Sequence, residues 1–157
     1  MVDQETYHEA ISEQHYLKGK KRDFFWRLET PVRLGRAGID KIGLGALIGL
    51  SDSWRVDCYM VAEHLLWLQK HYWQSRYSVS FPRLRPCTGG VEPASGMDEK
   101  QLVQTICAFR LLAPEIELPL STRESPWFRD HVIPPPINTV RAFSKTQPVD
   151  YPSHLPG

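Results

Sequence analysis

The chain has 157 residues, of which 41% are hydrophobic and 24% charged, and its 19 Lys and Arg against 18 Asp and Glu leave a formal net charge of +1. This length and composition are typical of one folded domain and exclude a chain that is disordered throughout. The balanced charge argues against a protein built mainly to bind nucleic acid, and no apolar run approaches the roughly 20 residues of a membrane helix. We therefore expect neither nucleic acid nor membrane as a partner.

The N-terminal residues lack the basic and apolar regions of a secretory signal, so a cytoplasmic location is expected. Cys58, Cys87 and Cys107 are too far apart for a short metal-binding motif, and their odd number excludes an even disulfide framework. We interpret them as free thiols that are buried or partly buried.

The first half of the chain predicts two helices around one buried strand. Residues Ile11 to Arg22 are polar and are interpreted as a loop. A proline at the first helical position and a closing glycine predict a short helix over about Pro31 to Ala37. The apolar run within Ile39 to Leu50 does not alternate, as expected of a strand covered on both faces. A long helix is predicted over about Ser53 to Trp73. Its expected apolar face comprises Trp54, Cys58, Val61, Ala62, Leu65, Leu66 and Leu68.

The second half continues the alternation. A short strand is predicted over Tyr77 to Phe81, and a long loop over Pro86 to Pro93. Asp98 and Gln101 resemble a capping box for a helix that ends near Leu112. The last predicted elements are a strand over Ile116 to Ser121, a short helix from Ser125 to Val132, a strand over Ile137 to Val140, and a polar tail.

Strands that alternate with helices indicate βαβ units, with a parallel sheet covered by helices. In such folds the loops that follow the strands lie at one end of the sheet and form the functional face. The loops expected to converge there are Gln4–Glu9, Gly49–Ser53, Pro82–Pro93 and Thr122–Pro126.

The segment Gln4 to Glu9 concentrates an amide, carboxylates, a hydroxyl, a phenol and an imidazole beside an expected strand end. This composition favours a functional loop. The alternative is a polar turn in which His8 and Glu9 face solvent. A zinc protease helix is not supported, because Ser12 stands where the second histidine would be.

Arg83 and Arg123 each follow a predicted strand. The planar guanidinium binds a carboxylate with two parallel hydrogen bonds, so two arginines at corresponding strand ends suggest an anionic or amino-acid ligand. Taken singly, each is more often part of a structural ion pair.

Two other clusters are interpreted structurally. Trp67, Tyr72, Trp73 and Tyr77 are expected in the core rather than on a stacking platform. Lys18 to Arg22 is interpreted as a solvated loop rather than a nucleic-acid site.

Several motifs together carry a resemblance to a known family. They are Gln4–Glu9, Asp23–Glu29, Gly35–Ile39, Gly43–Leu47 and Ser121–Glu124. From about residue 4 to residue 147 the chain closely resembles the tyrosine lyases of thiamine biosynthesis, also called 2-iminoacetate synthases or ThiH proteins. The resemblance implies an α/β fold: a partial (β/α)8 barrel of the radical S-adenosylmethionine type, about strands four to eight, with a parallel sheet and outer helices.

The resemblance also implies the chemistry. Enzymes of this family cleave tyrosine to 2-iminoacetate (dehydroglycine) and p-cresol for the thiazole ring of thiamine, and they use a [4Fe-4S] cluster and S-adenosylmethionine. The cluster is held by a CxxxCxxC motif, which this sequence lacks.

Residues 1–147 are therefore expected to form a C-terminal half-barrel that resembles the biotin and thiamine synthesis associated domain, and residues 148–157 a disordered tail. We expect a truncated or split lyase that is inactive by itself. The alternative is a non-catalytic binding module that associates with a separate barrel half or with thiazole synthase.

The family's site residues carry over one by one. Glu5 and Arg27 would hold S-adenosylmethionine, through its hydroxyl or amino groups and its carboxylate. Arg83 and Arg123 would face the tyrosine carboxylate, and we expect Glu5, Arg83 and Arg123 on one rim at the strand ends. The weaker members of the same pocket are Tyr7, His8 and Ser121. No catalytic residue or metal ligand is assigned.

Overall fold

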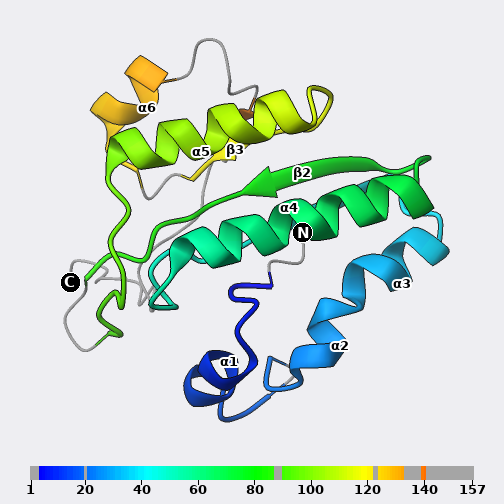
Figure 1. The fold of residues 1–157 in the computed structure, drawn as a ribbon, viewed down its shortest axis with the longest axis horizontal. Helices are drawn as coiled ribbons and strands as arrows, with labels where there is room; N and C mark the ends of the chain where they lie inside the picture. The colour runs from blue at the N-terminus through cyan, green and yellow to red at the C-terminus, as the bar shows by residue number, and fades with distance from the viewer. Residues whose placement is uncertain (1–3, 20, 87–89, 122–123, 133–138, 141–157) are drawn as a thin grey trace, which may run out of the picture.

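The computed structural model describes residues 4–19, 21–86, 90–121, 124–132 and 139–140. Short helices at the N-terminal end precede a parallel strand pair, and two long helices alternate with the strands (Figure 1). The elements in chain order are α1 (Glu9–His15), α2 (Phe24–Leu28), α3 (Thr30–Arg36), β1 (Lys41–Gly45), α4 (Trp54–His71), β2 (Arg76–Ser80), α5 (Glu99–Leu112), β3 (Pro119–Leu120), α6 (Pro126–Val132) and β4 (Thr139–Val140).

The described strands form a small parallel sheet. β1 and β2 are paired along their whole length, and β3 and β4 form a second parallel pair. Single parallel bridges extend the first pair on both sides, because Glu5 pairs with Ala46 and Ser78 pairs with Glu117. The predicted parallel sheet with helices, a partial α/β fold, is confirmed.

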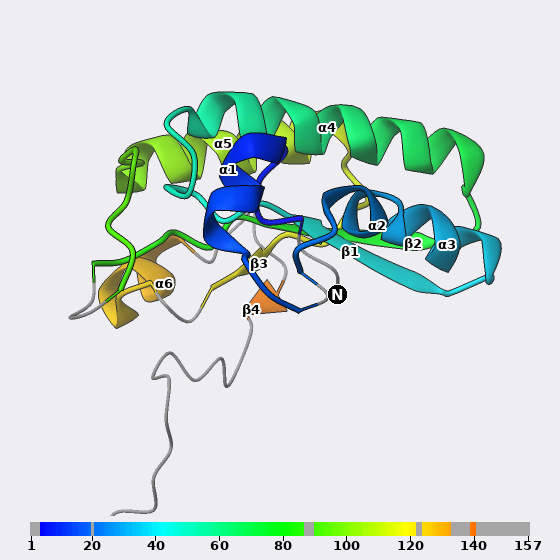
Figure 2. The ribbon, with the colours of Figure 1, turned by 90° about the horizontal axis from the view of Figure 1, so that it is seen from below.

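The hydrophobic core lies between this sheet and the helices α4 and α5, which run along one face of it (Figure 2). Ile42 and Leu44 of β1 meet Leu65, Leu68 and Leu102 of the helices in this cluster, and each of the five is at most 2% exposed. Burial of each large apolar side chain contributes roughly 1.5–3 kcal/mol. The three- and four-residue steps of α4 thus correspond to a buried stripe, as predicted.

The predicted capping box of α5 is confirmed. The Asp98 carboxylate accepts a hydrogen bond from the Gln101 backbone N–H at 2.7 Å, and the Gln101 side-chain oxygen accepts from the Asp98 N–H at 3.0 Å. These bonds satisfy two backbone donors and fix where the helix begins. No helix within the described ranges is long and apolar enough to cross a membrane.

The prediction of a loop over residues 11–22 is wrong in part, because α1 runs through Ile11 to His15, and α2 follows it unpredicted. His8 makes no side-chain cap bond to α1, and Ser12 is its only buried residue, so neither a cap nor an apolar stripe marks this helix in the sequence. Asp23 caps α2 by accepting from the Trp26 N–H at 2.8 Å. A helix of five residues is too short to show a period.

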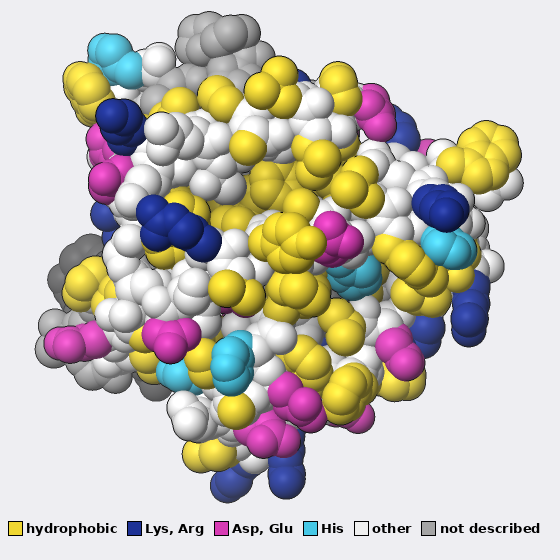
Figure 3. All heavy atoms as spheres, viewed as in Figure 1, with side chains coloured by type: hydrophobic (Ala, Val, Ile, Leu, Met, Phe, Trp, Pro, Cys, Tyr) yellow, Lys and Arg dark blue, Asp and Glu magenta, His cyan; other side chains and the backbone are white. Residues whose placement is uncertain are grey.

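The outer side of α4 also differs from expectation. Leu66 and Trp67 are 41% and 45% exposed, and Trp73 just beyond the helix is 75% exposed. Hydrophobic side chains gather over the middle of this face, where α4 runs (Figure 3). Leu66 and Trp67 follow the buried Leu65 directly and therefore turn away from the sheet. Tyr77 is buried, as predicted.

The two described cysteines also differ in burial. Cys58 on α4 is buried, as predicted, whereas Cys107 on α5 is exposed, so that prediction is wrong for Cys107. Cys107 directly follows the buried Ile106 and lies on the outer side of its helix. Cys87 lies outside the described residues.

Candidate functional site

Two of the three residues predicted on one rim lie beside the ends of the strands. Glu5 pairs with Ala46, the residue after β1, and Arg83, three residues beyond β2, pairs with Ile48. Parallel strands bring their carboxyl ends to the same edge of a sheet. Arg123, the third predicted residue, lies outside the described residues.

Glu5 is held by a cluster of side chains from α2 and from the connection between α1 and α2. Its carboxylate accepts hydrogen bonds from the Tyr16 hydroxyl and from Lys21, the latter at 2.7 Å. Arg27 Nη2 lies 3.4 Å from the same carboxylate oxygen as Lys21. Glu5 has a φ of 71°, a left-handed conformation that costs a residue with a side chain free energy, so the surrounding contacts must stabilise it.

The two residues predicted to hold the cofactor are therefore neighbours. Arg27 is 8% exposed, and its guanidinium lies 5.4 Å from the centre of the Tyr16 ring. Lys21 lies 5.5 Å from the same ring. With two cations around one carboxylate, the cluster carries surplus positive charge, which favours an anionic group nearby.

A buried carboxylate fixes the residues that follow Glu5. Asp57 in the first turn of α4 is 2% exposed and accepts from the Thr6 hydroxyl at 3.0 Å, the Tyr7 N–H at 2.8 Å and the Ser51 hydroxyl at 2.6 Å. Donors from three segments thus compensate the cost of burying this charge. Asp57 ties the N-terminal segment, the loop after β1 and α4 to one another.

Tyr7 and His8 follow Thr6 in this anchored segment. The Tyr7 hydroxyl is 2.9 Å from His64 Nδ1 on α4, and burial lowers the pKa of His64 below its usual 6.5. His8 is exposed, and its backbone N–H donates to the Thr6 hydroxyl at 3.1 Å. Of these two predicted pocket members, only Tyr7 is packed against α4.

Arg83 lies in a buried ion pair. Its Nε donates to Glu124 Oε1 at 2.8 Å, its Nη2 donates to Glu124 Oε2, and its Nη1 donates to the Met97 carbonyl at 2.9 Å. The hydrogen bond to Glu124 raises the pKa of Arg83. Arg85 adds a bond to Glu124 at 2.8 Å while its own side chain is 49% exposed. The fork of Arg83 thus already binds a carboxylate of this chain.

Ser121, the last predicted pocket member, is half-buried at the end of β3, and its carbonyl accepts from the Glu124 N–H at 3.1 Å. Ser121 therefore helps to place the Glu124 carboxylate under the two arginines. The bonds of Glu124 to Arg83 and Arg85 join the loop after β3 to the segment after β2.

The two cysteines that the structure describes, Cys58 and Cys107, lie on different helices. The described residues contain no group of three or more His, Cys, Asp or Glu side chains that could hold a metal ion. Burial, with a smaller effect of Asp57, raises the pKa of Cys58 to about 12, which disfavours the thiolate that a metal requires. Cys107 is on another helix and faces solvent.

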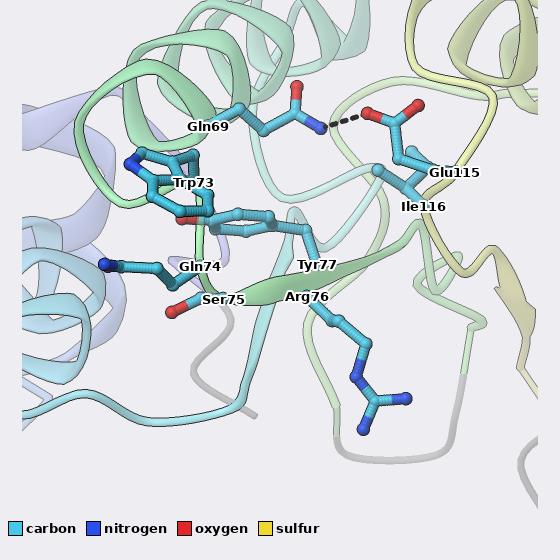
Figure 4. A pocket seen from close by; sticks show the side chains of 8 residues that line it. All are labelled: Gln69, Trp73, Gln74, Ser75, Arg76, Tyr77, Glu115 and Ile116. Atoms are coloured by element: carbon cyan, nitrogen blue, oxygen red, sulfur yellow. Dashed lines mark hydrogen bonds between the residues drawn. The ribbon is translucent and has the colours of Figure 1, made fainter.

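A pocket of about 360 Å³ lies at the opposite end of β2 (Figure 4). Its lining includes Trp73, Arg76 and Tyr77, and Gln69 Nε2 donates to Glu115 at 3.0 Å above it. It contains none of the predicted site residues. In parallel α/β folds, residues at this end usually serve stability.

Several side chains of the site are not predicted from the sequence, among them Tyr16, Lys21, Asp57, His64 and Glu124. Asp57 is an acid on the apolar face of α4, next to Cys58, and that position could have indicated it. Glu124 stands within a motif that carried the resemblance, yet its partner Arg83 is 41 residues away. Tyr16 and Lys21 lie in the segment interpreted as a loop and carry no comparable signal.

Comparison with known proteins gives the family that the chain resembles. Residues 80–151 match the Biotin and Thiamin Synthesis associated domain. Over 156 residues, 99% of this chain, the sequence is 87% identical to the 2-iminoacetate synthase of Salmonella typhimurium and 83% identical to that of Escherichia coli. The chain spans 41% of the length of each of these curated relatives.

Solved structures share the fold. A crystal structure of HydG, a maturase of FeFe-hydrogenase, superposes with a TM-score of 0.77 at 32% identity, over 88% of this chain and 31% of that one. The HydG maturase from Carboxydothermus hydrogenoformans gives 0.75 at 29% identity, over 88% and 32%. The resemblance predicted from the motifs is thus confirmed: the chain is closely similar, over nearly its whole length, to part of the 2-iminoacetate synthases.

Proposed function

We propose that this chain is part of a radical S-adenosylmethionine tyrosine lyase, which in its complete form cleaves tyrosine to 2-iminoacetate and p-cresol for the thiazole ring of thiamine. The observation that carries this proposal is the 87% identity to a 2-iminoacetate synthase over 156 residues. At this identity, the relative and this chain should share both fold and site.

The cluster around Glu5 supports a role in holding S-adenosylmethionine, which when bound supplies the radical that starts the cleavage. Glu5 would accept hydrogen bonds from the hydroxyl or ammonium groups of S-adenosylmethionine, and Arg27 would bind the carboxylate of the same molecule. The distance of 3.4 Å between Arg27 Nη2 and Glu5 Oε1 supports a role of both residues in binding one ligand. The Lys21 side chain is 60% exposed, so the ligand would displace it from the Glu5 carboxylate.

Tyrosine would bind at the same end of the sheet. In this proposal Arg83 and Arg123 face its carboxylate, and Tyr7, His8 and Ser121 complete the pocket. Glu124 already binds the guanidinium of the buried Arg83. The half-exposed Arg85, which binds the same Glu124 carboxylate, would therefore supply the more accessible positive charge beside Arg83.

The residues of this chain do not fit a [4Fe-4S] cluster. The sequence has three dispersed cysteines and no CxxxCxxC motif. Cys58 and Cys107 lie on different helices, one buried and one exposed. We therefore infer that the chain has no lyase activity by itself and that any activity requires the cluster ligands of another polypeptide segment.

The test has two arms. The purified chain is incubated with iron, sulfide, reductant, S-adenosylmethionine and tyrosine, alone and together with the part of the Escherichia coli synthase that it does not cover. We expect p-cresol only from the mixture. Formation of p-cresol by the chain alone would refute its inactivity, and failure of the mixture, with the intact Escherichia coli enzyme active in parallel, would count against the lyase role.

A second candidate function is a non-catalytic binding module for a separate barrel half or for thiazole synthase. Among the described residues, the segment at Glu5 pairs only with the end of β1, so its other edge offers backbone groups to a further strand. Light scattering and pull-down at micromolar concentration test this. A monodisperse monomer that ignores both partners would eliminate this candidate.

A further inference from the structure

The side chain of Gln4 carries an amide whose role is unexplained. The residue is 5% exposed, and within the described part of the chain neither its Oε1 nor its Nε2 has a hydrogen-bond partner. A primary amide accepts at its oxygen and donates twice from its nitrogen. Buried polar groups are nearly always paired, because an unpaired one disfavours the folded state. Gln4 therefore calls for a partner from outside the described residues.

Hydrogen bonds hold the backbone at Gln4 and at the residues that follow it. Its N–H donates to the Gly45 carbonyl at 3.1 Å, at the end of β1. The next residue, Glu5, holds its left-handed conformation, and the residues after it are bound by Asp57. The backbone bond of Gln4 itself and the anchors of the residues that follow it thus hold an unpaired amide near the carboxyl end of β1.

The chemistry nearby indicates what the partner is. Immediately next in sequence, the Glu5 carboxylate is faced by Lys21 and Arg27, so charges of both signs occur here with the positive sign in excess. An α-amino acid head group carries the complementary pair, a carboxylate and an ammonium. Its carboxylate can accept from Gln4 Nε2, and its ammonium can donate to Oε1.

We propose that the Gln4 amide is a binding group for the head group of an α-amino acid ligand. This inference rests on the proposed function, since tyrosine and S-adenosylmethionine both carry that head group. It assigns Gln4 a role in binding and none in the stability of the fold.

The test replaces Gln4 by Met, which has a similar shape and no amide. Binding of L-tyrosine and of S-adenosylmethionine to the purified chain is measured by calorimetry, and stability by urea denaturation. Q4M should lower the affinity for the ligand that Gln4 contacts by about tenfold or more. It should leave the denaturation midpoint unchanged or raise it, because an unpaired buried amide is removed.

Analogues without the head group identify the contact and the source. p-Cresol lacks the whole head group of tyrosine, and methylthioadenosine lacks the whole head group of S-adenosylmethionine. The analogue of the contacted ligand should therefore bind Q4M and the unchanged chain equally. Gln69→Met, at the other end of the sheet, is the matched control and should change neither affinity.

Three results would overturn the proposal. They are affinities unchanged by Q4M, a Q4M chain that fails to fold, and an unchanged chain that binds neither ligand. A failure of the lyase proposal is seen in a separate measurement, as absence of p-cresol from the reconstituted mixture. That result would not change the lower affinity expected of Q4M for the head group.

Discussion

The face of the sheet beneath α4 and α5 and the carboxyl end of the same sheet are stabilised in different ways. Under the helices, large apolar side chains pack against one another, and neighbouring positions on a helix differ sharply in burial. At the carboxyl end, buried carboxylates such as Asp57 and Glu124 join segments far apart in sequence. Under the helices, stability is therefore most sensitive to the size of apolar side chains. At the carboxyl end, it is most sensitive to the loss of a hydrogen-bond or ion-pair partner.

The strongest test of this contrast is Glu124→Gln. The variant leaves the buried Arg83 without its carboxylate, so we expect the free energy of unfolding to fall by about 3–5 kcal/mol. Urea denaturation measures the change. Arg85→Gln removes the half-exposed partner instead and should cost below about 1 kcal/mol. Equal losses of stability in the two variants would show that the buried pair of Arg83 and Glu124 does not stabilise this end of the sheet.

Adjacent leucines on α4 test the helix-covered face. Leu65 is fully buried and Leu66 is 41% exposed. Leu65→Ala should lower stability by about 2–5 kcal/mol through lost contacts and a residual cavity. Leu66→Ala should change stability by less than about 0.5 kcal/mol, as at most surface positions. Comparable losses in denaturation experiments would contradict the described orientation of α4.

Asp57→Asn probes the polar anchor without changing its size. Asparagine keeps one acceptor oxygen and brings an amide donor towards the donors of Thr6, Tyr7 and Ser51. We expect a loss of about 1–3 kcal/mol by urea denaturation. Asp52→Asn, at an exposed position just before α4, is the control and should have little effect.

The capping box of α5 should contribute less. Asp98→Ala removes the acceptor for the Gln101 N–H, and the expected loss is about 1 kcal/mol. Lys100→Ala at an exposed position in the same turn should stay within about 0.5 kcal/mol. An Asp98 variant as stable as the control would mean that the helix begins equally well without its cap.

The same contrast explains what could be predicted from the sequence. The long helix α4, the cap of α5 and the buried strand β1 follow from local periodicity and capping, which need no knowledge of distant residues. Helix α1 could not be predicted this way, because it has no side-chain cap and one buried residue.

The candidate site was predictable in its location and less so in its contacts. The rule that parallel strands end together places Glu5 and Arg83 beside strand ends. The partners of those side chains could not be read from any short pattern, since Glu124 is 41 residues from Arg83 and Asp57 is 51 residues from Thr6. Long-range polar pairing leaves no period in a sequence.

The smallest expected effect concerns pH. Burial of His64 lowers its pKa below 6.5, so the unfolded chain binds a proton at a higher pH than the folded chain does. The contribution of this histidine to stability is therefore complete above pH 6.5 and is lost as the pH falls through the lower pKa of the folded state. The contact with the Tyr7 hydroxyl and the half-buried position give this loss a structural origin.

Urea denaturation at about pH 7.5 and about pH 5.5 tests this effect by comparing the unchanged chain with His64→Gln. The unchanged chain should lose more stability on acidification than the variant does, because the variant has no imidazole to protonate there. His8→Gln, at an exposed residue, should behave like the unchanged chain. If His64→Gln loses as much stability as the unchanged chain, the buried imidazole is not the titrating group, and the polar end of the sheet owes its acid sensitivity to its carboxylates.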